Sequence, residues 1–325
     1  MYPVIFQVGD FPLRSFSVLV MAGFLLGTWL WARLLAKHGR DPRKDPERSG
    51  SVAMWLLIGV IGGARLAYVA VESAGYLTAD LTPGMERFLA AEDRAAVRNE
   101  ISLEDLEAVR PIITGHDFLH DPLSILFIWE GGLVMYGGMF GAILLGLWSA
   151  KRQGMHPWNA LDTGLIAGMI GQAVGRWGCL LVGDDYGSVV PESMRELPFP
   201  LTITVPDKQW LIDNPESLFE HSLAGEVLWA TQPWMSFNAL AVGLAGLYVL
   251  QRAKWWGAAS IWILFHYSIS RFVIEMFRGD SIRGLWFDGA ISTSQLVSIP
   301  GALAAIVLWF VFKDKAPRID APTSA

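Results

Sequence analysis

Seven apolar runs constrain this chain more than any other feature. They lie at residues 15–35, 52–71, 124–150, 161–181, 234–250, 256–277 and 291–312. A helix rises ~1.5 Å per residue, so each run is long enough, or nearly so, to cross ~30 Å of hydrocarbon. The chain is 53% hydrophobic and 17% charged, which is too apolar for a soluble globular protein. The sequence therefore predicts an all-α polytopic membrane protein, with one membrane domain over residues 1–325.

Basic residues indicate the orientation of these runs, because Lys and Arg gather in cytoplasmic connections. They follow the first, third, fifth and seventh runs: Lys37, Arg40, Arg43, Lys44, Arg48; Lys151, Arg152; Arg252, Lys254; Lys313, Lys315 and Arg318. The other side carries two long acidic loops, residues 72–123 and 182–233. We therefore predict seven transmembrane helices, an outer N-terminus and a cytoplasmic C-terminus. The N-terminus lacks a basic n-region, so we expect no removable signal peptide.

The two outer loops carry different local patterns. In the first, Ser102 precedes a run of acidic residues, a pattern typical of a helix start. An amphipathic helix and a solvated spacer both fit this loop. In the second, apolar and polar residues alternate at residues 201–205, which predicts a strand or hairpin arm.

Five of the polar residues inside the apolar runs can share the outer half of the membrane in this topology. They are Arg65, Tyr136, Arg176, Arg271 and Glu275. A charge inside a membrane helix is a functional hypothesis by default. Three arginines against few carboxylates predict an excess of positive charge that an anion should complete. Guanidinium matches phosphate, so a phospholipid headgroup is the expected ligand.

Each of these residues also has a structural alternative. Arg271 and Glu275 are spaced i, i+4 and can neutralise each other. Arg65 can bind backbone carbonyls or reach toward the interface. Arg176 is near a helix end and can lie at the interface, and Tyr136 can be a packing aromatic. These alternatives stay open on the sequence alone.

Glycines and a few isolated residues complete the pattern. Glycines four residues apart, as at Gly137 and Gly141, predict close helix packing. The doublets at 131–132 and 137–138 suggest a cavity wall beside Tyr136. Asp162 is expected to cap a helix, and Cys179 to be a small apolar residue at a helix end. The six His are scattered and the single Cys has no partner, so we expect no metal, no cofactor and no disulfide.

Five segments of the chain resemble the motifs of a single known family. They are GRWGCLLVGDDYG (175–187), WEGGLVMYGGMFG (129–141), GGARLAYV (62–69), RFVIEMFRGD (271–280) and SQLVSIP (294–300). In their content and in their order along the chain, these segments resemble motifs of the bacterial prolipoprotein diacylglyceryl transferase family. The resemblance implies transfer of an sn-1,2-diacylglyceryl group from phosphatidylglycerol to the lipobox cysteine of a preprolipoprotein, in the cytoplasmic (inner) membrane. No nucleic-acid partner is expected.

The resemblance also implies residue roles. Its catalytic set is Tyr136, Arg176, Arg271 and Glu275, in which the two arginines hold the phosphate and Glu275 orients the arginine. Its substrate-binding set is Arg65, Tyr267, Gly137, Gly138, Gly175, Gly178, Asp184 and Gly187. Arg65 and Tyr267 would line the lipid site.

Several positions depart from the family pattern. The two signature Asn positions hold Cys179 and Val182, and the signature Glu is the shorter Asp184. Tyr136 stands where the family usually has His, and the Tyr-Glu pair of the fifth run is replaced by residues 237–238. Two functions therefore stay open: a diacylglyceryl transferase, and a non-catalytic phospholipid-binding paralogue. A transporter is weaker, because inverted repeats with broken helices are not found.

Overall fold

The computed structural model describes residues 1–8, 11–79, 89, 103–127, 132–280, 284–287 and 289–314. The chain is predominantly helical and forms two compact units. The first unit comprises residues 1–49 and 155–325, and the second comprises residues 50–154. A single membrane domain covering the whole chain stays a prediction.

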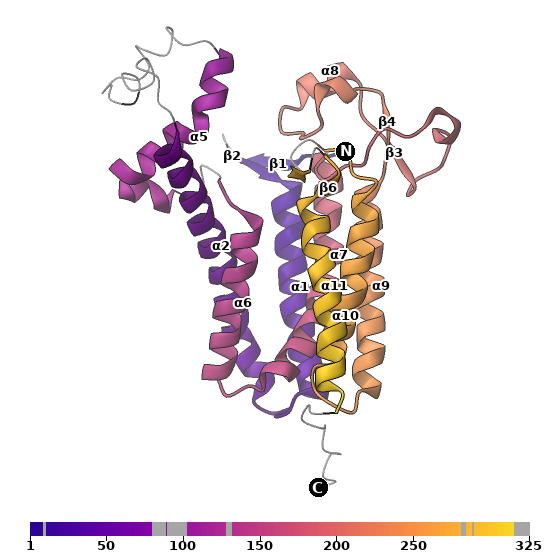
Figure 1. Ribbon diagram of the computed structural model, residues 1–325. Coiled ribbons are helices and arrows are strands. Elements are labelled where there is room, and N and C mark those ends of the chain that lie inside the picture. The colour runs from indigo at the N-terminus through magenta and orange to yellow at the C-terminus, as the bar shows by residue number, and fades with distance from the viewer. Residues whose placement is uncertain are drawn as a thin grey trace. The chain divides into compact units, whose positions relative to one another are not determined.

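Five long helices form the first unit, running side by side (Figure 1). They are α1 (Ser15–His38), α7 (Pro157–Val182), α9 (Thr231–Arg252), α10 (Ala258–Glu275) and α11 (Thr293–Phe312). Helix α7 packs against α1, α9 and α10, and α11 packs against α10. A Cβ on Gly23 would collide with the carbonyl oxygen of Gly171, and the reverse is also true. Small residues thus bring the α1 and α7 backbones into contact, as the glycine spacing predicts.

Asp162 is buried on α7 and caps a different helix from the one expected. Helix α7 is capped by His156 with Pro157 in its first turn. The Asp162 carboxylate instead accepts from the backbone N–H of Gly257 at 2.7 Å and of Ser260 at 2.8 Å, and from the Ser260 hydroxyl at 2.6 Å. The cap is therefore real but belongs to α10, because the fold brings the second turn of α7 next to the beginning of α10.

The connection between α7 and α9 forms a small cap on the first unit, at the end of the bundle where α7 finishes (Figure 1). Strands β3 (Thr202–Thr204) and β4 (Val227–Trp229) pair antiparallel, which confirms the strand predicted at 201–205. Helix α8 (Lys208–Asp213) and two 3₁₀ turns, η4 (Glu192–Met194) and η5 (His221–Leu223), complete the connection. Its core is apolar: Leu180, Tyr186, Ile203, Val205, Leu211, Phe219, Leu228 and Ala230.

Two short hairpins lie elsewhere in the first unit. Strands β1 (Val4–Val8) and β2 (Phe11–Arg14) pair before α1. Strands β5 (Leu285–Trp286) and β6 (Ile291–Ser292) pair before α11. The Ser292 side chain accepts from the Gln295 N–H, and the Gln295 side chain accepts from the Ser292 N–H. This capping box fixes where α11 begins.

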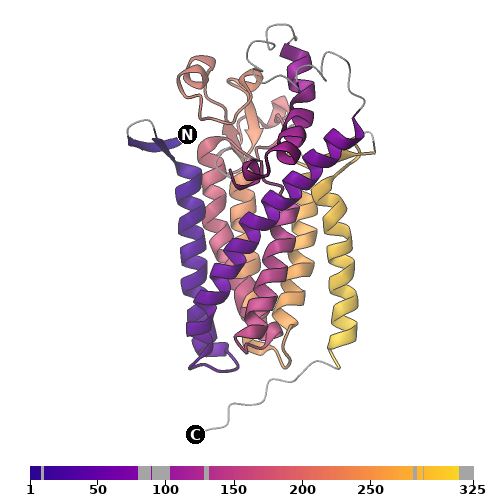
Figure 2. The same cartoon turned by 90° about the vertical axis from the view of Figure 1, so that its left-hand side faces the viewer.

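The second unit contains most of α2 (Asp45–Thr78), α5 (Leu103–His120), η2 (Pro122–Leu126) and α6 (Met135–Arg152) (Figure 2). Helix α5 starts directly after Ser102, which agrees with the predicted helix start, although Ser102 itself lies outside the described residues. The single helix predicted over residues 124–150 is wrong at its beginning. A 3₁₀ turn ends at Leu126 and the helix begins at Met135, after Gly132 with φ +75°.

Among the described residues, five helices are long and apolar enough to cross a membrane: α1, α2, α7, α9 and α11. This supports a multi-pass membrane protein. Helices α6 and α10 occupy the remaining predicted spans, but they are not among the five. Each has 18 residues, and each carries charged residues at its end. The count of seven spans and their orientation stay predictions.

Candidate active site

One carboxylate joins two arginines where α7 and α10 end. Asp185 lies just beyond the end of α7, and its side chain pairs with the guanidinium of Arg176. Its other carboxylate oxygen lies 2.5 Å from Nη2 of Arg278, which is 93 residues away in the sequence. Arg176 and Arg278 therefore share a single counter-ion.

The turn that carries Asp185 is fixed by its backbone. Gly183 closes α7 in the left-handed region at φ +79°, and Asp185 is left-handed too at φ +55°. The carbonyl of Asp184 accepts from the side chain of Gln232 at 2.8 Å, and the carbonyl of Asp185 accepts from the hydroxyl of Thr231 at 2.7 Å. Both donors are fully buried in the first turn of α9. The acidic turn is thus anchored on α9.

Arg278 is held by acidic groups on two sides. Its guanidinium contacts both oxygens of Asp280, at 2.8 and 2.5 Å, and lies 3.7 Å from Glu275. Its backbone forms a bridge with Gly187. A Cβ on Gly187 would collide with the backbone of Trp229, so a glycine is needed for this close approach. Gly187 therefore has a packing reason to be glycine.

Arg271 and Glu275 form an ion pair on one face of α10. Arg271 Nη1 lies 2.5 Å from a Glu275 oxygen, and the Glu275 side chain is 1% exposed. Arg271 Nη2 also donates to the Ser294 hydroxyl at 3.0 Å. The structure therefore contains the i, i+4 ion pair that was the structural alternative for these two residues.

The predicted excess of positive charge is wrong around these arginines. Arg176 faces Asp185 and Arg271 faces Glu275, so each has a carboxylate partner. Asp185, Arg278 and Asp280 were given no role from sequence. The signals present for them were the acidic turn at residues 183–187 and the i, i+3 spacing from Glu275 to Arg278. Neither signal reveals that the two segments meet.

The pKa values of the two neighbouring acids of the turn, Asp184 and Asp185, are shifted in opposite directions. Burial alone would raise the pKa of Asp185, but the positive charges of Arg176, Arg278 and Arg271 outweigh it and lower that pKa below its usual value. Burial, followed by the negative charge of Asp185, raises the pKa of Asp184. One Asp184 oxygen accepts from the backbone N–H of Asp185 at 2.9 Å. Asp185 is therefore the firmly ionised member of the pair.

Three other predicted residues lie on the faces of α7 and α10. The hydroxyl of Tyr267 accepts from the side chain of Gln172 at 2.7 Å and links the two helices. A Cβ on Gly178 would lie 3.1 Å from the Cα of Phe16, and one on Gly175 would lie 3.8 Å from Val20. Gly175 and Gly178 therefore face the α1 packing surface.

Arg65 belongs to the second unit and binds backbone carbonyls. Its guanidinium donates to the carbonyls of Ile125 at 2.9 Å, Ser124 at 2.8 Å and Gly132 at 3.3 Å. The ring of Phe118 lies 5.1 Å from its Cζ atom. The carbonyl-binding alternative is therefore present, and these bonds hold the segment that precedes α6.

Tyr136, Gly137 and Gly138 lie in the first turn of α6, also in the second unit. A Cβ on Gly137 would collide with Gly63 and Ala67 of α2, and one on Gly138 would lie 2.9 Å from the Val60 carbonyl oxygen. The cavity wall expected at this doublet is wrong, because the two helix backbones touch there. Tyr136 is half-buried beside this contact.

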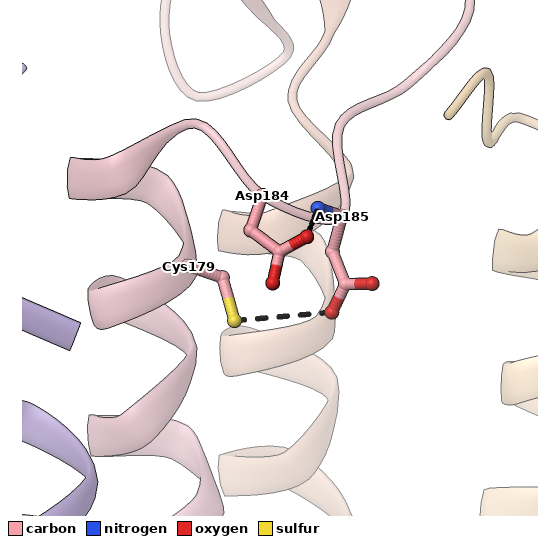
Figure 3. Close-up of side chains that lie close together, drawn as sticks. All are labelled: Cys179, Asp184 and Asp185. Carbon is pink, nitrogen blue, oxygen red and sulfur yellow. Dashed lines mark hydrogen bonds between the residues drawn. The ribbon is translucent and has the colours of Figure 1, made fainter. Parts of the chain in front are cut away.

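Cys179 lies close to the arginine-bound turn. Its sulfur is 3.7 Å from Nη1 of Arg176 and 3.8 Å from an oxygen of Asp185. Figure 3 shows the Cys179 side chain directed toward the Asp185 carboxylate, with Asp184 beside it. In the part of the chain that the structure describes, these three residues offer ligand atoms within 4.8 Å of one another. Both Asp185 oxygens already contact arginines, whose positive charge opposes a cation. The site is therefore a set of paired charges, in which Arg176, Arg271 and Arg278 face Asp185, Glu275 and Asp280. We call these six residues the arginine–carboxylate centre.

A comparison with known families gives this centre its context. The family model described as prolipoprotein diacylglyceryl transferase matches residues 3–93 and 108–311. The chain belongs to the prolipoprotein diacylglyceryl transferase family. The matched residues include Arg176, Arg271, Glu275 and Arg278. The arginine–carboxylate centre is therefore part of a member of this family.

Curated relatives agree with the family assignment. The chain is 24% identical to the phosphatidylglycerol–prolipoprotein diacylglyceryl transferase of Rhodospirillum centenum, over 99% of this chain and 95% of the relative. It is 28% identical to the protein of that name from Gloeobacter violaceus, over 98% and 96%. It is 31% identical to the one from Shouchella clausii, over 69% and 76%. The match to the first two covers nearly the whole of both chains.

Proposed function

We propose that this family member transfers an sn-1,2-diacylglyceryl group from phosphatidylglycerol to the lipobox cysteine thiol of a preprolipoprotein in the bacterial cytoplasmic membrane. The observation that carries the proposal is the convergence of Arg176, Arg271 and Arg278 near the ends of α7 and α10. Fixed guanidinium groups suit a reaction in which a phosphate leaves with negative charge.

The reaction has one bond formed and one broken. The peptide thiolate attacks the glyceryl carbon that bears the phosphate, and a carbon–sulfur bond forms. The bond between that carbon and the phosphate oxygen breaks, and its electron pair leaves with glycerol phosphate. We assign binding of the phosphate to Arg176 and Arg271, and positioning of Arg271 to Glu275, which pairs with it. The released thiol proton needs a base, and we assign that role to the phenolate form of Tyr136, which takes the proton on its oxygen.

The remaining assignments concern the lipid. Arg65 and Tyr267 would line the lipid site, with Asp184 beside the phosphate. The glycines Gly137, Gly138, Gly178 and Gly187 support this site by allowing close backbone approach, and Gly175 faces α1 on the same helix as Gly178. No cofactor enters this scheme, because substitution at carbon needs only a thiolate, a leaving group and charge stabilisation.

We also propose seven membrane spans with the N-terminus outside. Helices α6 and α10 have 18 residues each, about 27 Å at ~1.5 Å per residue, which is close to the hydrocarbon thickness. The basic connections then all lie on the cytoplasmic side. Residues 72–123 and 182–233 form the two outer loops of a single membrane domain. The acidic turn with Asp185 would face the outer leaflet.

The direct test is transfer from radiolabelled phosphatidylglycerol to a synthetic lipobox peptide by the purified full chain in detergent. A labelled thioether product that is absent with Arg271→Ala supports the proposal. Tyr136→Phe should lower kcat by about 10²-fold or more, the range for losing a general base. No product, with phosphatidylglycerol still bound and an active relative alongside, would favour the non-catalytic lipid-binding paralogue. The replacements Cys179 and Val182, both buried, are the observation behind that second candidate.

A further inference from the structure

Asp185 occupies the place between two arginines that an anionic ligand would need. Its two carboxylate oxygens contact Arg176 and Arg278 separately, so one carboxylate spans both guanidinium groups. A phosphate presents the same kind of oxygen pair to arginine.

The charges around Asp185 determine how its carboxylate would affect the binding of an anion. The guanidinium groups of Arg176, Arg271 and Arg278 face the carboxylates of Asp185, Glu275 and Asp280. Three positive charges thus meet three negative ones, and Asp184 adds a further acidic group next to them. An anionic phosphate approaching this set would meet no net attraction while Asp185 stays in place.

Displacement of Asp185 would change this balance mostly at Arg176. Arg278 keeps a second partner, since Asp280 contacts it through both oxygens. Within the described residues, Asp185 is the carboxylate with which Arg176 forms its ion pair. The backbone of the turn is anchored by Thr231 and Gln232, so the side chain can turn away while the backbone stays. The side chain of Asp185 is 20% exposed, which leaves it a way out.

We propose that Asp185 is an internal competitor of the substrate phosphate: its carboxylate holds Arg176 and Arg278 ready, and a phosphate ester binds by displacing it. The inference rests on the proposed function and deepens it. A ligand must replace both ion pairs, so lipid-anchored phosphodiester is favoured over free phosphate, which lacks the additional binding of the acyl chains. After transfer, the returning carboxylate assists release of glycerol phosphate. Asp185 is thus a positioning and specificity-determining residue.

The test uses Asp185→Asn in the full chain. Asn has nearly the same shape and tolerates the left-handed backbone at φ +55°, so the change removes mainly the charge. Binding of inorganic phosphate and of glycerol phosphate is measured by calorimetry, without peptide or lipid. We expect the Kd of both to fall about tenfold in Asp185→Asn, the effect of losing one close competing charge. An unchanged or raised Kd in the folded variant would overturn the proposal.

Two control variants distinguish an effect of the Asp185 charge on phosphate binding from an effect on the structure. Asp185→Glu keeps the carboxylate and should leave the Kd of phosphate close to wild type. Glu226→Gln removes the exposed carboxylate that pairs with Arg195 at 2.8 Å in the same connection, and should leave it unchanged. In the transfer assay, Asp185→Asn should lower KM for phosphatidylglycerol, whereas a merely structural loss would lower kcat and leave KM or raise it.

A measurement on the unmodified chain keeps the proposal testable if the variants do not fold. Carbodiimide coupling of a glycine ester, followed by mass spectrometry, reports how accessible the Asp185 carboxylate is. Phosphatidylglycerol in mixed micelles should increase labelling of Asp185 severalfold, relative to micelles of a neutral lipid. Protection by phosphatidylglycerol would overturn the inference. Because phosphate binding and labelling need no transfer, a chain that fails the transfer assay still gives an independent answer here.

Discussion

The carboxylate of Asp162 on α7 caps the first turn of α10, accepting from the backbone of Gly257 and from both the backbone and hydroxyl of Ser260. These partners are 95 to 98 residues away in the sequence. The contact fixes the two helices at the same level, and α10 carries Arg271 and Glu275 at its other end.

Replacing this cap should cost stability. Asp162→Ala leaves two backbone N–H groups and a hydroxyl unsatisfied in a buried place, each loss costing about 1–3 kcal/mol. We expect the unfolding temperature of the detergent-solubilised chain to fall clearly. Asp207→Ala is the matched control, since Asp207 caps the short exposed helix α8 through the N–H of Trp210. An equal effect of the two variants would contradict the special role of Asp162.

Removing Arg271 or Arg176 should abolish transfer while the protein still inserts. Each guanidinium is expected to stabilise the leaving phosphate, and loss of one such donor typically costs 10²–10³-fold in kcat. The measurement is transfer of labelled lipid with membrane insertion followed by fractionation. Arg195→Ala serves as control, because Arg195 pairs with Glu226 on the surface of the same unit. Normal activity in both Arg271→Ala and Arg176→Ala would refute the assignment.

Gly187 should tolerate no side chain. A Cβ there would meet the backbone of Trp229, next to the bridge with Arg278. Gly187→Ala should therefore lower both the unfolding temperature and the transfer rate, because Arg278 is shifted. Gly50→Ala is the comparison: nothing lies within 4 Å of its Cβ position, and alanine favours the helix by about 1 kcal/mol. A Gly187→Ala protein as stable and active as wild type would contradict this prediction, because it would show that the Trp229 backbone can move to accommodate the Cβ.

The pH dependence of stability should differ between the two acids of the turn. Asp185 has a lowered pKa in the folded chain, so its stabilisation is present above the unfolded pKa, about 3.9, and is lost as pH falls through the folded value. Asp184 has a raised pKa, so its contribution falls as pH rises from the unfolded to the folded value. The unfolding temperature is measured across this pH range. The loss of stability at low pH that comes from Asp185 should be absent in Asp185→Asn, and the loss at rising pH that comes from Asp184 should be absent in Asp184→Asn. The opposite assignment of trends would contradict the electrostatic analysis.

The sequence by itself determined most of the helical segments, the family and the packing role of several glycines. Hydropathy and small-residue spacing are local patterns, and the helix starting after Ser102 and the strand at Thr202–Thr204 follow from them. The motif residues Arg176, Arg271 and Glu275 were likewise visible, because their types are unusual inside apolar runs.

Only the tertiary structure decided how the charges are balanced. The pairing of Asp185 with Arg278 and the cap from Asp162 to α10 join residues more than 90 positions apart. The break before α6 likewise depends on Arg65, which binds carbonyls some 60 residues away. Hydropathy and spacing report the environment of a segment along the chain. A buried charge takes its partner from whichever segment the fold brings within about 3 Å, and no local pattern contains that distance.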